Sequence, residues 1–395
     1  MESGAELRVQ AAKLRGFPPF PTWNGTLSAP SRGDGGLCSV LGAGGELVVL
    51  QHSAREGDQH GHEGSWLAVR KVLPAAGGEA TSFCQCWASD GSLVATVRDR
   101  RVAIYSGEDF RELVQLQLRF SVVSMDVVKR RRQSTADGDS TLEVLLMVGT
   151  AFGGLLYSVK VGEEKTVGDL VGQTPDPVAR IHEEVAVCLV KFSDDGCTAA
   201  LGTMDGRLFL RRVDTHDDEL STFGTAVLTK VLVAPRVTSM SFSACSSKLV
   251  VATKKGNVYV FARASGTGQW QTLSSCKELC VNPKPKPTGA AGVSKTATVA
   301  QTLVACWGPV FVVCSRAVTS RLEIYDFASG CLLHSLQLAP APASSTALST
   351  WVDQQLVTGV CAVRTSSGAS RLLCHDTSTN LALVEWPFLS AMMDG

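Results

Sequence analysis

The chain has 395 residues, and its 37 Lys and Arg balance 37 Asp and Glu, so the formal net charge at neutral pH is zero. This balance argues against a general electrostatic attachment to nucleic acid or to an anionic membrane. Hydrophobic residues make up 45 % and charged residues 19 %, which is enough apolar material for a folded core and too little charge for a disordered chain.

The composition favours short strands over long helices. Glycine is frequent, with 37 residues, and aromatic residues form only 6 % of the chain. The common Val and Thr residues suit a pleated sheet, and glycine suits the tight turns between strands. We therefore expect an all-β fold.

The cysteines and the apolar stretches indicate where the chain resides. The 13 cysteines are an odd number without a Cys-x-x-Cys pair, and residues 1–6 contain no apolar signal core. Reduced thiols in the cytosol fit this pattern, with the nucleus as a second compartment. The longest apolar stretch, residues 302–314, is shorter than the roughly 20 residues of a spanning helix, so we expect no membrane span.

The clearest structural unit lies in residues 182–210. Three segments with the apolar character of strands are separated by Asp195-Gly196 and Asp205-Gly206. Asp-Gly is a strong hairpin signal because it tolerates the positive φ of a primed turn, so this unit predicts three consecutive antiparallel strands. Similar units occur in chain order at residues 37–50, 83–105, 122–157, 237–261, 302–325 and 356–374.

These seven units have the spacing of propeller blades. Their third strands follow one another at intervals of about 50 to 64 residues, which is slightly longer than a WD repeat. We predict a single β-propeller with seven four-stranded blades, and six or eight remain as alternatives because three units have indistinct first strands. The residues that open the predicted third strands are Leu47, Val102, Leu155, Leu208, Val258, Leu322 and Leu372.

The chain ends are expected to close the ring. A propeller buries the two apolar faces of each blade against its neighbours, and a shared last blade joins the two ends. Residues 6–27 or residues 381–386 could complete that blade. The predicted division is an N-terminal arm at 1–30 that contributes a closing strand, a propeller at 31–388 and a short tail at 389–395.

Three residues carry a resemblance to a known family. His182 precedes the first strand of the clearest unit, Thr203 ends its second strand, and Asp205 lies in the following turn. This arrangement resembles the WD-repeat family of β-propellers, in which such residues form a hydrogen-bonded group with a Trp inside each blade. Arg211 stands in the Trp place, and the chain contains no Trp-Asp pair. The resemblance implies that His182, Thr203 and Asp205 stabilise their blade.

Three insertions have an unusual composition. His52, His60 and His62 lie in a glycine-flanked polar stretch, which we interpret as a solvated loop and not as a zinc site. The basic run Lys129 to Arg132 is interpreted as a solvated loop, with a targeting signal or a phosphorylation site as alternatives. Residues 280–295 predict a spacer.

The sequence predicts an interaction protein. No nucleophile elbow, zinc-binding helix motif or P-loop occurs, so we expect no catalytic residue, cofactor or metal. Cys84 and Cys86 are interpreted as small buried side chains. The preferred hypothesis is a non-enzymatic, WD-repeat-like scaffold or subunit of an intracellular complex. One alternative is a guanine nucleotide exchange factor, because the order of the strong blades and the Gly-rich first hairpin resemble the ER-anchored propeller that activates the COPII-coat GTPase. Another alternative is a propeller hydrolase.

The partners are expected to be other proteins, bound through a propeller rim. Arg98, Arg100, Lys254 and Lys255 recur in equivalent second hairpins, together with Asp99, Asp205 and Arg207. In a propeller such turns lie on one rim, and their mixed charge favours specific protein pairing.

Overall fold

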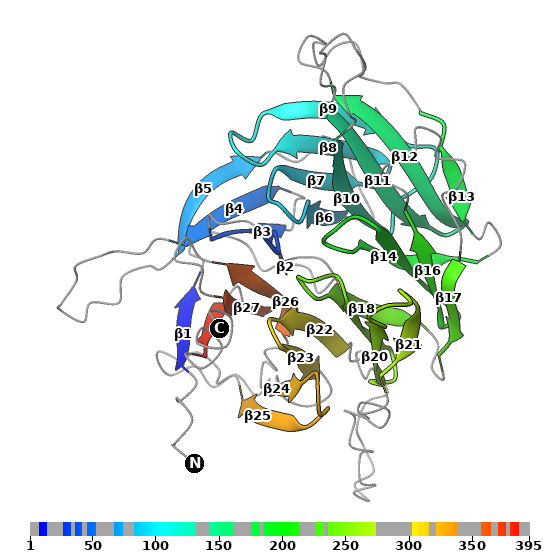
Figure 1. Cartoon of the computed structure of the whole chain (residues 1–395). Coiled ribbons are helices and arrows are strands. Elements are labelled where there is room, and N and C mark those ends of the chain that lie inside the picture. Colours follow the sequence, from blue (N-terminus) through cyan, green and yellow to red (C-terminus); the bar gives the residue numbers. More distant parts are fainter. Residues whose placement is uncertain are drawn as a thin grey trace, which may run out of the picture.

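The computed structural model describes residues 8–13, 27–32, 36–41, 46–52, 67–73, 83–131, 142–161, 175–181, 185–213, 226–232, 236–273, 302–315, 321–337, 357–364, 370–376 and 380–386. Every regular element of this part of the chain is a β-strand. The strands form seven four-stranded antiparallel sheets, which stand as blades around a central axis (Figure 1). The prediction of an all-β propeller with seven four-stranded blades is confirmed.

Blades 1 to 3 each use four consecutive strands, with the first strand nearest the axis. Blade 1 contains β2 (Leu27–Ser28), β3 (Leu37–Leu41), β4 (Leu47–His52) and β5 (Leu67–Leu73). Blade 2 contains β6 (Phe83–Trp87), β7 (Leu93–Arg98), β8 (Arg101–Ser106) and β9 (Glu112–Gln117). Blade 3 contains β10 (Ser124–Arg131), β11 (Leu142–Thr150), β12 (Gly153–Val161) and β13 (Ala179–Ile181).

Blades 4 to 6 follow the same order. Blade 4 contains β14 (Val187–Phe192), β15 (Thr198–Thr203), β16 (Arg207–Arg212) and β17 (Ala226–Val231). Blade 5 contains β18 (Val237–Phe242), β19 (Lys248–Thr253), β20 (Val258–Arg263) and β21 (Trp270–Thr272). Blade 6 contains β22 (Thr302–Trp307), β23 (Val310–Ser315), β24 (Arg321–Asp326) and β25 (Leu332–Gln337).

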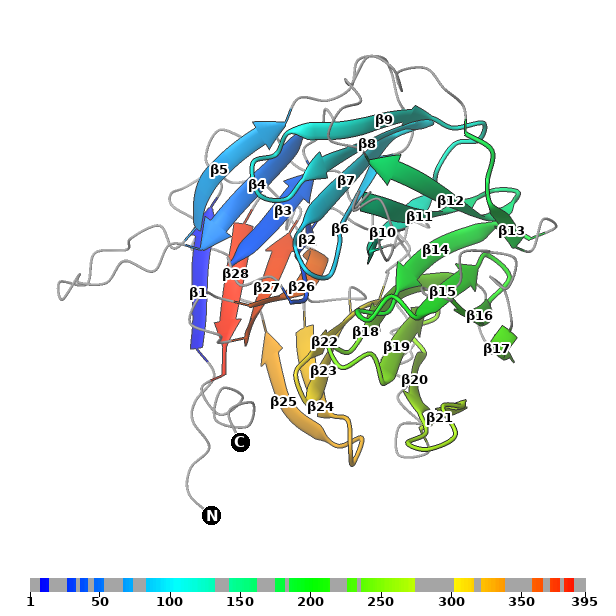
Figure 2. The same ribbon diagram turned by 45° about the horizontal axis from the view of Figure 1, so that its top comes forward.

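Blade 7 joins the two ends of the chain. It contains β26 (Val357–Arg364), β27 (Ser370–Asp376) and β28 (Asn380–Glu385), and its outermost strand is β1 (Arg8–Lys13). β1 pairs antiparallel with β28, in a register that runs from Arg8 opposite Glu385 to Lys13 opposite Asn380 (Figure 2). Both predicted closing segments therefore meet in one blade. The first blade begins at Leu27, inside the segment predicted as the arm, and the predicted domain limits stay a prediction.

One predicted third strand is wrong. Leu372 lies on β27, which is the second strand of blade 7, whereas the other six residues of that set lie on third strands. The reason is that blade 7 takes its fourth strand from the N-terminal end, so its third strand is β28.

The basic run also differs from its prediction as a loop. Lys129, Arg130 and Arg131 continue β10, and Arg130 lies opposite Glu143 of β11. The side chains of Arg130 and Glu143 are 3 % and 4 % exposed and form an ion pair. Arg132 lies outside the described residues. At least one charge of this run is therefore part of the blade interior.

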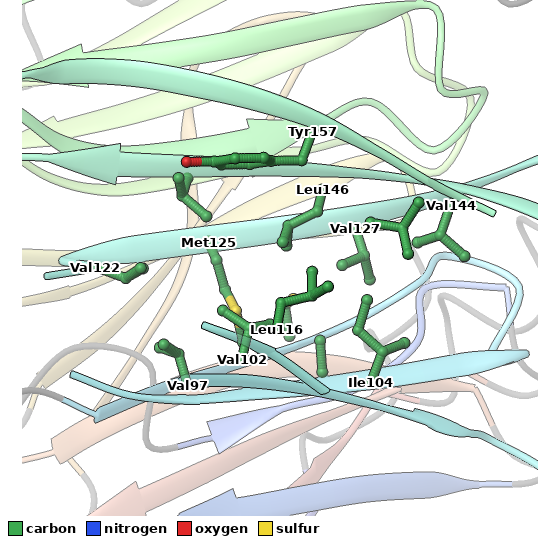
Figure 3. Packing of buried hydrophobic residues seen from close by; sticks show 14 of the residues in the cluster. Val97, Val102, Ile104, Leu116, Val122, Met125, Val127, Val144, Leu146 and Tyr157 are labelled. Atoms are coloured by element: carbon green, nitrogen blue, oxygen red, sulfur yellow. The ribbon is translucent and has the colours of Figure 1, made fainter. Parts of the chain in front are cut away.

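The core lies between neighbouring blades. Figure 3 shows the interface of blades 2 and 3, where the apolar faces of two sheets pack against each other. Burial of such faces is the main favourable contribution to folding, and each propeller blade can bury its faces only by stacking on its neighbours. The labelled residues of this interface include Val97, Val102, Ile104 and Leu116 from blade 2, and Met125, Val127, Leu146 and Tyr157 from blade 3.

Close contact between blades depends on glycine at one repeated position. A Cβ atom at Gly149 of β11 would lie 2.7 Å from the carbonyl oxygen of Val187, and one at Gly202 of β15 would lie 2.6 Å from Cβ of Val237. Val187 and Val237 begin the first strands of the following blades. The absence of a side chain therefore lets each next blade approach.

Candidate functional site

Two of the three residues of the predicted His-Thr-Asp group are in contact. The hydroxyl of Thr203 hydrogen bonds to the carboxylate of Asp205, and it accepts the backbone N–H of Arg207 at 2.8 Å. Asp205 also lies 2.9 Å from Nε of Arg207. These contacts brace the turn between β15 and β16. His182 lies outside the described residues, so the complete group stays a prediction.

The turns between the second and third strands of blades 2 to 5 lie on one face of the propeller, because equivalent strands run in the same direction around the ring. We call this the turn face. It carries the predicted rim residues, of which Arg100, Lys254 and Lys255 are exposed. Arg98, at the end of β7, is half-buried.

Backbone hydrogen bonds connect these turns to the chain segments that enter the next blades. The N–H of Val122 donates to the carbonyl of Asp99 at 2.8 Å. The N–H of Arg236 donates to the carbonyl of Met204 at 3.0 Å, and the carbonyl of Arg236 accepts the N–H of Lys254 at 3.0 Å. The turn face is therefore a fixed surface, since its loops are held by main-chain contacts.

Basic side chains outnumber acidic ones among the described residues of the turns of blades 2 to 5 and of the segments that enter the next blades. Asp99 lies 3.4 Å from Nε of Arg100, and Asp205 pairs with Arg207. Exposed pairs of this kind add little stability, so their charges remain available to solvent and to a ligand. The basic set consists of Arg98, Arg100, Arg101, Arg119, Arg207, Arg236, Lys254 and Lys255.

The first strands of the seven blades enclose a central channel with a cavity of about 560 Å³. Asp126 of β10 and Lys191 of β14 form an ion pair of 3.5 Å on its wall, and Asp126 also accepts the N–H of Phe192 at 2.7 Å. Burial raises the pKa of Asp126. Desolvation opposes the charge of Lys191, but the carboxylate of Asp126 raises its pKa above the ordinary value.

The channel is bridged on the face opposite the turns. Arg32, between β2 and β3, donates its backbone N–H to the carbonyl of Ser89 at 2.7 Å and a guanidinium N–H to the carbonyl of Ala244 at 2.8 Å. Its Nε also lies 4.0 Å from Oδ2 of Asp194. Burial raises the pKa of Asp194 to about 6, although Ser31 and Arg32 lower it. Arg32 thus joins blades 1, 2, 4 and 5.

Asp126, Lys191 and Asp194 are not among the site residues that the sequence predicts. A signal was available for Lys191, because it interrupts the apolar strand between Val190 and Phe192. For Asp194 the sequence shows only a polar turn, and its position beside Arg32 depends on blades that are distant in sequence.

The predicted burial of the cysteines is confirmed for Cys84 and Cys86, which are 7 % and 0 % exposed. Burial raises the pKa of the Cys84 thiol to about 12 and also raises that of Cys86, so both remain thiols. No three His, Cys, Asp or Glu side chains in the described part of the chain gather where they could hold a metal ion. His60, His62 and residues 280–295 lie outside that part, as does the side chain of His52.

None of the described residues forms a helix long and apolar enough to cross a membrane.

The comparisons with known proteins support the fold. No family model matches the chain, and no curated protein matches it. Among solved structures, the chain is similar to the Cps50 (Swd1) β-propeller domain of Myceliophteria thermophila, with a TM-score of 0.52 and 10 % sequence identity. The match covers 93 % of this chain and 98 % of that one. At this identity, the likeness establishes a shared propeller fold.

Proposed function

We propose that this chain is a non-enzymatic interaction scaffold, a WD-repeat-like subunit of an intracellular multiprotein complex in the cytosol or nucleus, which binds other proteins through the turn face. The observation that carries the proposal is the set of turns over blades 2 to 5, whose backbone is held by main-chain hydrogen bonds and which presents exposed charged side chains. Rigid blades that present variable loops are the usual means by which repeat proteins bind partners.

The electrostatics of the turn face also fit protein binding. Arg100 and Arg207 lie beside Asp99 and Asp205, so the surface carries both signs of charge with a basic excess. Such mixed patterns favour a complementary protein surface over a uniform polyanion. No observation favours the alternatives of a nucleotide exchange factor or a hydrolase, and these stay predictions.

The proposal is tested by affinity capture from cell extract with the full chain as bait. We expect at least one protein to co-purify in stoichiometric amounts. Reversal of the exposed turn-face charges, in the variant Arg100→Glu, Lys254→Glu, Lys255→Glu, should reduce capture several-fold. The loss should come mainly from slower association and should be larger at low salt.

A matched variant provides the control. Arg111, Arg212 and Arg364 are exposed at the opposite ends of the strands, so their reversal to Glu changes the net charge equally on the other face. Both variants should keep the β-rich circular dichroism spectrum. Equal capture by the two variants would reject the turn face as the interface, and the absence of any stoichiometric partner would reject the scaffold function.

A further inference from the structure

Large apolar side chains are exposed on the turn face over blades 3 and 4. Phe152, in the turn between β11 and β12, is 62 % exposed, and Met204, in the equivalent turn of blade 4, is 44 % exposed. Val123, immediately before β10, is 48 % exposed. The rings of Phe120 and Phe152 lie 5.2 Å apart between centroids. We call Phe120, Val123, Phe152 and Met204 the apolar patch.

The turn that carries Phe152 is held in one conformation. Thr150, which is buried, accepts the backbone N–H of Phe152 at 3.0 Å through Oγ1 and donates to the carbonyl of Gly153 at 2.9 Å. The neighbouring Val123 donates its N–H to the carbonyl of Gly149 at 2.9 Å. A preorganised apolar surface loses little conformational entropy when a ligand binds. Exposed apolar side chains that are grouped in this way mark interaction sites.

Basic residues flank the apolar patch on the side of blade 2. Arg119 directly precedes Phe120 and is exposed. The N–H of Leu118 donates to the carbonyl of Arg100 at 2.8 Å, which brings the turn of blade 2 next to this segment. Arg100 itself is about half exposed at 52 %. Arg100 and Arg119 therefore both belong to chain segments that lie next to Phe120.

Basic residues also flank the apolar patch on the side of blade 5. Arg236 lies between Met204 and Lys254, because its N–H donates to the carbonyl of Met204 and its carbonyl accepts the N–H of Lys254. Arg207, in the same turn as Met204, is 48 % exposed. The apolar patch thus has positive charge at both of its ends.

We infer that the apolar patch and its basic flanks bind an acidic peptide segment of a partner protein that carries an aromatic or leucine side chain. The apolar side chain packs on Phe120, Phe152 and Met204, and carboxylates on either side of it pair with the flanking arginines and with Lys254. Charge complementarity selects the acidic partner, and the exposed ring of Phe152 distinguishes this surface from one that attracts any polyanion. This inference rests on the proposed function and names the chemistry of its partner.

The test is selection from a random peptide library on the immobilised full chain, followed by fluorescence anisotropy with the most enriched peptide. We expect enriched peptides to contain Asp or Glu on both sides of Phe, Trp, Tyr or Leu. Phe152→Ser should weaken binding at least about tenfold, since central aromatic residues dominate binding energy. Phe152 is largely exposed, so this change should leave the melting temperature nearly unchanged.

A control variant and two other kinds of ligand test whether binding is specific to the apolar patch and to acidic peptides. Val72→Ser replaces a residue of β5 that is 48 % exposed, far in sequence from the apolar patch, and it should leave peptide affinity unchanged. Binding that Phe152→Ser does not alter, or the absence of any enriched peptide, would overturn the inference. Equally tight binding of anionic vesicles or of single-stranded DNA would overturn it as well.

The two proposals fail in different ways. If protein partners are captured through the turn face while Phe152→Ser has no effect on peptide binding, the scaffold function stands and the apolar patch is rejected. If no stoichiometric partner is captured, the proposed function fails, whatever the peptides do.

Discussion

Arg130 of β10 and Glu143 of β11 lie opposite each other and form an ion pair, with 3.4 Å between Nη1 and Oε2. Both side chains are at most 4 % exposed, and Ser158 donates a hydrogen bond to the second carboxylate oxygen. Two buried charges depend on each other because either one alone would lack compensation for its lost hydration.

Removal of one partner of this pair should therefore destabilise blade 3 strongly. We expect Glu143→Leu to lower the free energy of unfolding by about 3–5 kcal/mol, because it leaves a buried guanidinium without its carboxylate. Urea unfolding at neutral pH measures this value. The double variant Arg130→Met, Glu143→Leu should recover most of the loss. An exposed control, Glu108→Leu, should change stability little, and an equally small effect of Glu143→Leu would contradict the burial of the pair.

Because blades 4 and 5 approach each other closely at Gly202, a methyl group added there should lower the free energy of unfolding. A Cβ atom at Gly202 would lie 2.6 Å from Cβ of Val237, whose branched side chain has little freedom to move. Gly202→Ala should destabilise the protein by about 1–3 kcal/mol in thermal or urea unfolding.

The neighbour that causes this cost can be tested directly. In a Val237→Ala background the penalty of Gly202→Ala should shrink, because the atoms that clash with the new methyl group are absent. Strictly additive effects of the two changes would show that the penalty comes from elsewhere.

The predicted His-Thr-Asp group can be tested by a double-mutant cycle. Thr203→Val removes the hydroxyl that contacts Asp205 and the N–H of Arg207, and should cost about 1–2 kcal/mol. His182→Ala should lower the melting temperature without abolishing partner capture at a permissive temperature. If the two residues share one hydrogen-bonded group, their effects should be non-additive. Additive effects would separate His182 from Thr203.

The raised pKa of Asp194 should make the free energy of unfolding fall as the pH rises. Burial raises its pKa from the ordinary 3.8 to about 6, although Ser31, Arg32 and Lys191 lower it. Between these pH values the folded chain holds a proton that the unfolded chain releases, so the stability contributed by this group is complete below pH 4 and lost by pH 6.

The variant Asp194→Asn removes this titration. Relative to wild type, its free energy of unfolding should increase by up to about 3 kcal/mol as the pH rises through that window. Urea unfolding at several pH values gives this difference, and a difference that does not change with pH would show that the pKa of Asp194 is the same in the folded and unfolded chains.

The lowered pKa of His375 should give the opposite dependence of the free energy of unfolding on pH. It is fully buried on β27, and burial lowers its pKa from 6.5 to about 4. The unfolded chain binds a proton in this range that the folded chain does not, so stability falls as the pH decreases from 6.5 to 4. His375→Gln should reduce this acid sensitivity in the same unfolding series. An unchanged acid slope would indicate that the His375 imidazole is protonated in the folded protein.

The sequence by itself determined the local hairpins and favoured seven blades over the alternatives of six or eight. Residues 198–203 and 207–212 are short segments with buried apolar residues and are joined through Asp205-Gly206, where Gly206 has a φ of 88°. Such hairpins form between residues that are close in the chain, so their signals are local and can be read without the fold.

Only the tertiary structure decided how the blades meet and which side chains they leave exposed. The basic run was interpreted as a loop, yet Arg130 is buried because Glu143 of the adjacent strand compensates its charge. Phe152 carried no sequence signal, and its exposure depends on the position of its turn above blade 3. The sequence left open which of the two chain ends completes the last blade, and the structure uses both, with β1 paired to β28. These outcomes depend on contacts between distant segments, and local periodicity contains no information about which segments will become neighbours.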